Sequence, residues 1–185
     1  MRIIAGQYRG LALASVGKGD AGAHLRPTTD RARESLFSIL SGGRFGNPVT
    51  DARVLDLFAG TGALGLEALS RGAASVTFVD DGRKALSLIR ENIAKCRAQD
   101  ATQIVRRDAT RLGVGEPHDL IFLDPPYGKG LGEKALAAAI AGGWVAPRAF
   151  IVWEDSAAIT PPEGVTLLDA RKFGDTKISF LEAGA

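Results

Sequence analysis

The 185-residue sequence has few residues of the kinds that build disulfide frameworks and metal centres. It contains one cysteine, Cys96, so no disulfide can form within the chain. Its two histidines, His24 and His118, are isolated and match no metal-ligand spacing. We therefore expect no disulfide and no metal site, and we expect both histidines to lie in loops.

Long hydrophobic runs are also missing. No apolar stretch reaches the roughly 20 residues that a membrane-spanning helix needs, and the residues after Met1 show no signal-peptide pattern. These absences predict a cytoplasmic protein that does not bind membranes. The hydrophobic share of 45% is ordinary for a globular protein, and the length suits one domain with a small appendage. We expect this protein to be a monomer.

Positive charge is concentrated near the N-terminus, although the formal net charge is only +2. Residues 1–53 contain eight lysines and arginines against four acidic residues, so the first part has a charge of +4 and the rest −2. A basic segment beside a neutral body favours a polyanionic partner such as a nucleic acid. An arginine-rich solvated surface would give the same counts, so charge alone leaves both interpretations open.

From residue 53 onward, strand-like and helix-like patterns alternate. Strands are expected from residue 53 to 56 or 57 and at 75–79, 102–106, 120–123 and 150–153, helices at 83–96 and 132–141, and a closing hairpin at 165–173 and 176–181. This alternation predicts an α/β fold with a mostly parallel sheet covered by helices on both faces. The closing hairpin would add an antiparallel edge strand.

A small N-terminal unit precedes this pattern. Loosely alternating apolar residues at 1–13 predict a β-hairpin, and the glycine-rich segment 15–23 predicts a loop. A helix then begins at Thr29 or Asp30, either of which is a suitable N-cap. We therefore divide the chain into a basic, RNA-facing hairpin and helix at 1–52 and a main domain at 53–185.

Residues 54–72 predict a strand, a tight loop and a helix, which is the first unit of an open α/β sheet. An apolar run containing Asp56 leads into a glycine turn at 60–62, and apolar residues with helical spacing follow as far as Gly72. In such sheets the ligand binds in the crevice at the carboxyl end of the strand. The sequence therefore predicts a ligand site at this loop.

Two classes of cofactor are compatible with the loop. Gly60, Gly62 and Gly65 match the G-x-G-x-x-G pattern of dinucleotide sites, and Asp80 follows at the spacing of a ribose-binding acid. However, Asp56 would repel a pyrophosphate, whereas it would stabilise the ammonium and sulfonium groups of S-adenosylmethionine. We therefore favour a methyl-donor site. A plain strand-to-helix turn that uses glycine for positive φ is the structural alternative.

Carboxylates stand at or near the ends of four expected strands. They are Asp56, Asp80, Asp108 and Asp124. Because the carboxyl ends of parallel strands share one crevice, we expect these side chains to lie along one edge of the sheet. Each residue alone is common in turns and helix caps, but the four together favour a binding edge.

A second motif, Asp124-Pro125-Pro126-Tyr127, follows the expected fourth strand. The prolines remove two backbone donors, so the Asp124 carboxylate and the Pro125 carbonyl form a pocket of acceptors. Such a pocket fits an exocyclic amine, which it would hold so that the nitrogen lone pair points at a donor methyl group. Tyr127 offers a flat face on which an extruded base can stack. The alternative is a Pro-Pro turn with a structural tyrosine.

Both motifs resemble those of class I S-adenosylmethionine-dependent methyltransferases that modify exocyclic amines. Residues 2–10, 25–34 and 63–72 are similar to the RsmD family of 16S ribosomal RNA guanine-N2 methyltransferases. The similarity extends from Met1 through Tyr127 and, more loosely, to the end of the chain. It implies a Rossmann-like, seven-stranded sheet with a small N-terminal β-hairpin, and methyl transfer to the N2 amine of a guanine.

The resemblance also implies roles for individual residues. The donor would contact Asp56, Phe58, Ala59, Gly60, Thr61, Gly62, Asp80, Asp81, Asp108 and Ala109, with Asp80 on its ribose and Asp108 and Ala109 beside its adenine. The target base would meet Asp124, Pro125, Pro126 and Tyr127. The partner would be 16S ribosomal RNA, free or in a small-subunit particle, and it would contact Arg2, Arg9, Arg26, Thr29, Arg31 and Arg33.

Other functions remain open from the sequence. A DNA adenine or protein glutamine methyltransferase would use the same chemistry, although DNA enzymes usually have an extra recognition domain, for which 185 residues leave little room. A dinucleotide-dependent oxidoreductase would use the glycine loop but would have no use for residues 124–127. A non-catalytic RNA-binding module would need neither an intact glycine loop nor acidic strand ends.

Overall fold

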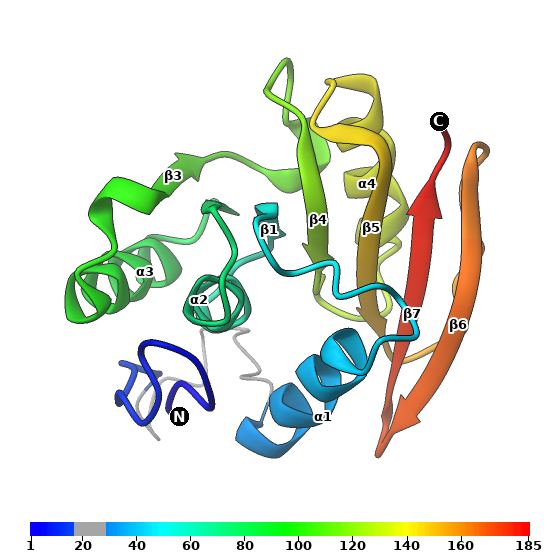
Figure 1. Ribbon diagram of the computed structural model, residues 1–185. Coiled ribbons are helices and arrows are strands. Elements are labelled where there is room, and N and C mark those ends of the chain that lie inside the picture. The colour runs from blue at the N-terminus through cyan, green and yellow to red at the C-terminus, as the bar shows by residue number, and fades with distance from the viewer. Residues whose placement is uncertain (17–28) are drawn as a thin grey trace.

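The computed structural model describes residues 1–16 and 29–185, which form an α/β fold around one seven-stranded sheet (Figure 1). The strand order is β3-β2-β1-β4-β5-β7-β6. The strands are β1 (Arg53–Leu57), β2 (Ser75–Asp80), β3 (Thr102–Arg106), β4 (His118–Leu123), β5 (Val145–Asp155), β6 (Val165–Phe173) and β7 (Thr176–Ala183). β1 to β5 pair in parallel, whereas β7 is antiparallel to both β5 and β6. The predicted Rossmann-like, mostly parallel sheet with an antiparallel C-terminal edge is confirmed.

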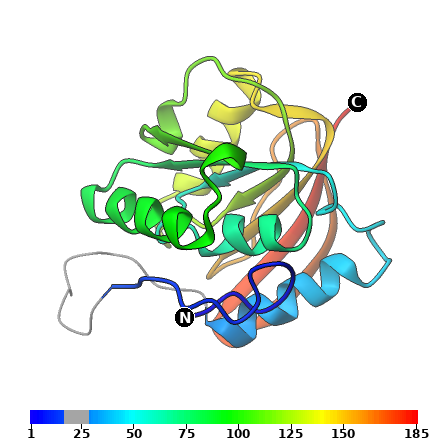
Figure 2. The same cartoon turned by 60° about the vertical axis from the view of Figure 1, so that its left-hand side comes forward.

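Helices cover both faces of this sheet (Figure 2). One face is covered by α1 (Asp30–Ser41), α2 (Ala63–Ser70) and α3 (Arg83–Cys96), and the other by α4 (Leu131–Ala141) with the short 3-10 helix η2 (Ala109–Arg111). A second 3-10 helix, η1 (Gln99–Ala101), precedes β3. Alternate residues of the central strands enter the two cores, because side chains along a strand point to opposite faces. Within the described residues no helix is long and apolar enough to cross a bilayer.

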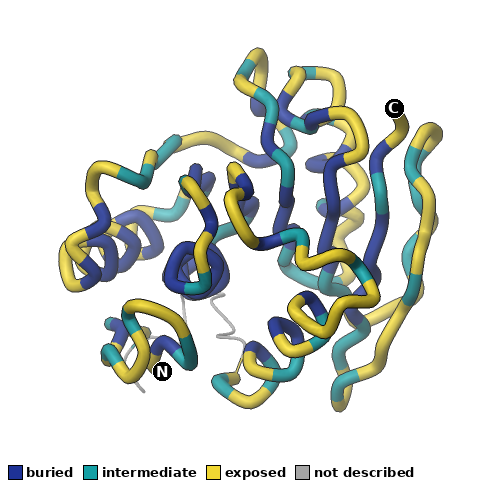
Figure 3. The backbone as a smooth tube through the Cα atoms, in the orientation of Figure 1, coloured by how far each residue is buried: buried dark blue, intermediate teal, exposed yellow. Residues whose placement is uncertain are grey.

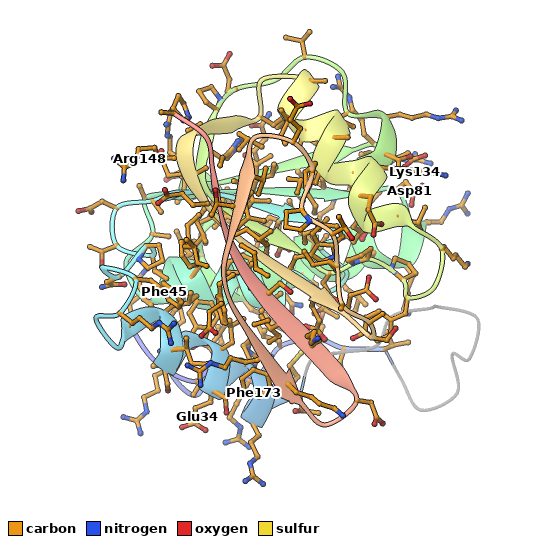
Figure 4. All side chains as sticks on the ribbon, turned by 90° about the vertical axis from the view of Figure 1, so that its right-hand side faces the viewer. Glu34, Phe45, Asp81, Lys134, Arg148 and Phe173 are labelled. Atoms are coloured by element: carbon orange, nitrogen blue, oxygen red, sulfur yellow. The ribbon has the colours of Figure 1, made fainter. Side chains whose placement is uncertain are left out.

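Burial is greatest at the centre of the sheet. Figure 3 shows buried backbone along β1, β4, β5 and α2, whereas β6 at the sheet edge is largely exposed. In the connection from α1 to β1, Phe45 covers the face of the antiparallel strands (Figure 4). Its ring centroid lies 5.1 Å from that of Phe150 and 5.2 Å from that of Phe180. The C-terminal hairpin is therefore packed into the same core as the parallel strands.

The predicted N-terminal hairpin is reduced to a short antiparallel turn. One bridge joins Arg2 to Ala12, and the backbone N–H of Leu13 donates to the carbonyl of Met1. Ile3 and Leu13 are buried in the core that α1 and α2 share with the sheet. The division of the chain at residue 52 stays a prediction, and the predicted loop at 15–23 lies outside the described residues from residue 17 onward.

The expectation that His118 lies in a loop is wrong. It begins β4 and is buried, with Nε2 2.9 Å from Thr77 Oγ1 and its ring stacked on that of Trp144 at 5.8 Å. Burial lowers the pKa of His118, so the neutral imidazole is favoured in the core. His24 lies outside the described residues.

Candidate active site

The loop between β1 and α2 has the backbone conformation that its glycines predict. Gly60 and Gly62 have left-handed backbone conformations with φ values of 60° and 78°, and Phe58 also has a positive φ of 58°. A Cβ at Gly65 would lie 2.5 Å from Phe78 Cε1 and 3.0 Å from Asp56 Oδ2. Only glycine at position 65 therefore lets α2 approach β1 and β2 this closely, which places the loop directly over the ends of both strands.

Asp56 lies beneath this loop with 1% of its surface exposed. Its Oδ2 accepts a hydrogen bond from the backbone N–H of Gly65 at 3.0 Å. Burial, with a smaller contribution from the charge of Asp80, raises the pKa of Asp56 to about 8. A positively charged ligand nearby would favour the carboxylate and lower this pKa, so the site is suited to a cation.

Asp80 at the end of β2 holds the loop in place. Its Oδ2 accepts from the N–H of Gly60 at 2.9 Å, and its Oδ1 accepts from that of Gly82 at 2.8 Å. Burial raises the pKa of Asp80, although the residue remains partly exposed. Because a carboxylate can accept about four hydrogen bonds, Asp80 can also receive ribose hydroxyls. The next residue, Asp81, is exposed.

Asp108 and Ala109 lie just beyond the end of β3. Asp108 is exposed and caps η2, accepting from the backbone N–H of Thr110 at 2.8 Å and from its hydroxyl at 2.7 Å. These bonds lower the pKa of Asp108. Ala109 is buried against the α4 side of the sheet. The structure thus places both residues at the carboxyl ends of the strands, and their contact with adenine stays a prediction.

Asp124 follows β4 and lies among other carboxylates. Burial raises the pKa of Asp124 well above its ordinary value, and the charges of Glu154, Asp56 and Asp155 raise it further. Asp56 and Glu154 lie in strands on either side of β4. The structure therefore brings the donor-loop acid Asp56 and the proposed target acid Asp124 into electrostatic contact.

Tyr127 is held at its hydroxyl group. The hydroxyl donates to Glu154 Oε1 at 2.9 Å and lies 3.1 Å from Thr176 Oγ1, so β5 and β7 both fix the ring. Burial is the main reason that the pKa of Tyr127 is raised. The sequence analysis did not include Glu154 among the site residues. The available signal was its position at the end of the fifth strand, which matches the position of the acids that follow the other strands.

On the RNA-facing side, the prediction for Arg33 is wrong. Arg33 is 0% exposed, and it forms ion pairs with Asp30 at 3.0 Å and with Glu67 at 3.5 Å. It shares the buried face of α1 with Leu36, Phe37 and Leu40, as the three- and four-residue spacing of a helix requires.

The other residues predicted to contact RNA are exposed on the surface or lie outside the described residues. Arg2, Arg9 and Arg31 are exposed, and the exposed Thr29 caps α1 by accepting from the N–H of Ala32 at 3.2 Å. Arg26 lies outside the described residues. In the part of the chain that is described, no group of three or more acidic, histidine or cysteine side chains could hold a metal ion.

A Rossmann-like sheet with a glycine loop after β1 and acidic residues at the strand ends defines the class of α/β proteins that bind a ligand at the carboxyl ends of their strands. The family described as Conserved hypothetical protein 95 matches residues 1–182, and the chain belongs to this family.

Similar proteins agree with this assignment. Ribosomal RNA small subunit methyltransferase D of Escherichia coli strain K12 is 40% identical over 155 residues, which is 83% of this chain and 74% of that protein. The protein of the same name from Haemophilus influenzae is 36% identical over 182 residues, 94% of this chain and 89% of its own. The solved structure of yhhF from Escherichia coli has a TM-score of 0.84 and 36% identity, with 100% of this chain and 98% of that chain covered. These comparisons confirm the predicted RsmD family and fold.

Proposed function

We propose that this chain transfers a methyl group from S-adenosylmethionine to the exocyclic N2 amine of a guanine in 16S ribosomal RNA. The observation that supports this most directly is the pairing of β1 with β4, in which Leu57 lies opposite Leu123. This pairing brings Asp56, beneath the glycine loop, close to Asp124, in the Asp-Pro-Pro-Tyr segment. The names of the relatives add the class of substrate, since they act on small-subunit ribosomal RNA.

The residues present fit the donor. When bound, S-adenosylmethionine supplies an electrophilic methyl group on a sulfonium. The buried carboxyl group of Asp56 lies where it can balance a positive charge, and Asp80 presents acceptors for ribose next to Gly60. A pyrophosphate would meet the same carboxylates unfavourably, which argues against a dinucleotide-dependent oxidoreductase.

The target amine is held by acceptors of the chain itself. The Asp124 carboxylate and the Pro125 carbonyl accept the two hydrogens of N2, so its lone pair is aimed toward the donor site. As the new nitrogen–carbon bond forms, the nitrogen becomes positive and Asp124 stabilises that charge. Because its pKa is raised, Asp124 can then take up the proton that leaves the nitrogen. Tyr127, fixed by Glu154 and Thr176, stacks on the extruded base.

Equilibrium binding tests the donor half of this proposal. Calorimetry with the purified protein should show binding of S-adenosylmethionine and none of NAD. Asp80→Ala should weaken donor binding about tenfold or more, because ribose hydroxyls and the loop N–H of Gly60 lose a charged acceptor. Asp100→Ala, in an exposed position on η1, is the matched control. Binding of NAD without binding of the methyl donor would overturn the proposal.

A further inference from the structure

Glu154 lies beside Asp124 because of the register between β4 and β5. Leu123 and Trp153 are direct partners in this parallel pair, and each is followed by one of the two acids. Since side chains alternate along a strand, both acids lie on the side of Phe122 and Val152, the face covered by α1, α2 and α3. Neighbouring strands are roughly 4.8 Å apart, so the two carboxylates lie next to each other at the crevice.

The orientation of Glu154 is fixed by the residue predicted to stack on the base. Tyr127 donates its hydroxyl hydrogen to Glu154 Oε1 at 2.9 Å, and the carboxylate raises the pKa of Asp124 through its charge. Both acids are partly exposed, so a ligand can reach them. The crevice thus presents two adjacent acceptor groups beside one aromatic ring.

Two adjacent acceptors match one edge of guanine and reject the corresponding edge of adenine. On the Watson–Crick edge of guanine, the N1–H donor is next to the N2 amine, so the two neighbouring positions are both donors. Adenine presents a lone pair at N1 beside its amine, and a carboxylate facing that lone pair would be repelled and left without a partner. A base extruded into a pocket is read through this edge.

We propose that Glu154 determines base specificity by accepting the N1–H of the target guanine, while Asp124 and Pro125 hold its N2 amine. This inference rests on the proposed function, because it assigns a role within the same site. It explains why a second carboxylate stands beside Asp124 despite the repulsion between them. It also gives Tyr127 a second task, since the tyrosine that stacks on the base also positions the group that reads its edge.

The test compares guanine with 2-aminopurine at the RNA position that the wild-type protein methylates. 2-Aminopurine keeps the 2-amine but has an unprotonated N1. The wild-type protein should prefer guanine by at least about a hundredfold in kcat/KM, because a carboxylate that meets no donor rejects the analogue. In Glu154→Gln the preference should fall tenfold or more, since an amide can either accept from or donate to N1.

Two variants serve as controls. Glu154→Asp retains a carboxylate and should retain most of the preference for guanine over 2-aminopurine. If Glu154 had a purely structural role, the aspartate and glutamine variants would show the same preference. Glu163→Gln, in an exposed position before β6, should behave as wild type. Donor binding by each variant verifies that the glycine loop is intact.

The outcomes separate this inference from the proposed function. If the wild-type protein modifies no RNA guanine, the proposed function fails and Glu154 has no such role. If it methylates guanine N2 but also accepts 2-aminopurine equally well, the role of Glu154 is refuted and the function stands. An unchanged preference in a Glu154→Gln protein that binds donor normally refutes it as well. If that variant does not fold, the wild-type preference and the Glu154→Asp variant still decide.

Discussion

Asp56 is a buried carboxyl group whose ionisation the fold opposes. Its pKa rises from 3.8 to about 8, mainly through burial, and the N–H of Gly65 offsets only part of this effect. Between these two pH values the folded state therefore holds a proton that the unfolded chain has lost. Asp56 is consequently compatible with the apolar core when neutral and becomes a strong site for positive charge when the donor arrives.

This shift predicts a pH-dependent stability. Because the folded pKa is raised, the contribution of Asp56 is fully present below pH 4 and is lost as the pH rises through about 8. Asp56→Asn removes this titration. As the pH rises within that range, the free energy of unfolding of the variant should therefore increase relative to that of the wild type by about 1 kcal/mol per pH unit. Urea unfolding of both proteins from pH 5 to 8 measures this difference, and a difference independent of pH would contradict it.

A second prediction concerns Asp124. Asp124→Ala should lower kcat by about a hundredfold or more, comparable to removing one preorganised hydrogen-bonding group, with the Kd for the donor little changed. Asp175→Ala, at the exposed turn between β6 and β7, should leave both constants unchanged. Methyl-transfer kinetics and calorimetry check the two parts, and full activity of the Asp124 variant would remove this residue from the mechanism.

At the residue scale, the sequence predicted side chains whose role follows from local spacing. Asp56 and Asp80 adjoin strand ends, and the structure joins them to the glycine loop through Gly65 and Gly60. The prediction that Arg33 contacts RNA is wrong because it rests on the positive charge of this residue and not on its position on the buried, apolar face of α1. Glu154 was missed because its proximity to Asp124 depends on the pairing of β4 with β5, which is a contact between distant parts of the chain.

At the element scale, the N-terminal turn is docked onto α2 by buried polar contacts. Glu67 accepts from the N–H groups of Ile4 at 2.9 Å and Ala5 at 3.1 Å, and it pairs with Arg71 at 2.7 Å. Ser70 Oγ accepts from the N–H of Tyr8 at 3.0 Å. Since α2 begins at the glycine loop, the turn and the donor site share one helix.

Two glycines in this turn provide a matched comparison. Gly6 and Gly10 both have φ of +83°, but a Cβ at Gly6 would lie 1.7 Å from the carbonyl oxygen of Ser70, whereas one at Gly10 would meet nothing within 4 Å. Gly10→Ala should cost only the backbone strain of about 1–2 kcal/mol. Gly6→Ala should cost about 1–3 kcal/mol more, because the turn must move off α2.

Urea unfolding of the two alanine variants gives the free energies of unfolding. If only the Gly6 variant loses RNA binding, this would further support the view that the N-terminal turn must pack on α2 to contact RNA. Equal stability of the two variants would contradict the close packing of Gly6 on Ser70.

The elements that the sequence predicted best are those with one continuous pattern. β3 and α3 have the predicted limits, since an apolar run and a helical stripe define them. β5 begins before the predicted residue 150. Pro147 and Arg148 interrupt the apolar pattern of the sequence, and Arg148 has a φ of 60°, but the strand continues through both residues. The N-terminal hairpin spans the predicted residues, but it has a single bridge because Glu67 and Ser70 accept hydrogen bonds from some of its backbone N–H groups.

At the scale of the whole molecule, the exposed arginines of the N-terminal turn and α1 lie on the same side of the sheet as the acidic crevice. Arg9 belongs to the N-terminal turn and Arg31 to α1, which both pack on this side, whereas the exposed Arg148 lies near the start of β5, away from Asp81 and the carboxyl ends of the strands (Figure 4). RNA bound across the first side could therefore reach Asp124 without crossing the sheet. The negative charge of the crevice would repel phosphates and leave the extruded base as the group that enters it.

This arrangement predicts a strong salt dependence of RNA binding. Each phosphate contact that is lost should reduce the slope of log K against log salt by roughly 0.7–0.9. Arg9→Ala together with Arg31→Ala should thus lower the slope by about 1.5 and leave donor affinity unchanged, whereas Arg148→Ala should leave the slope as it is. Filter binding over a series of salt concentrations measures the slope, and an unchanged slope in the double variant would exclude these arginines from the RNA contact.

The most direct test of the whole account is identification of the methylated nucleoside. The purified protein is incubated with labelled S-adenosylmethionine and small-subunit particles that lack the modification, with duplex DNA and unmodified protein as competing substrates. We predict label in N2-methylguanosine of 16S ribosomal RNA, and none with Asp124→Ala. Label in DNA adenine, in protein glutamine, or in no RNA nucleoside would contradict the account.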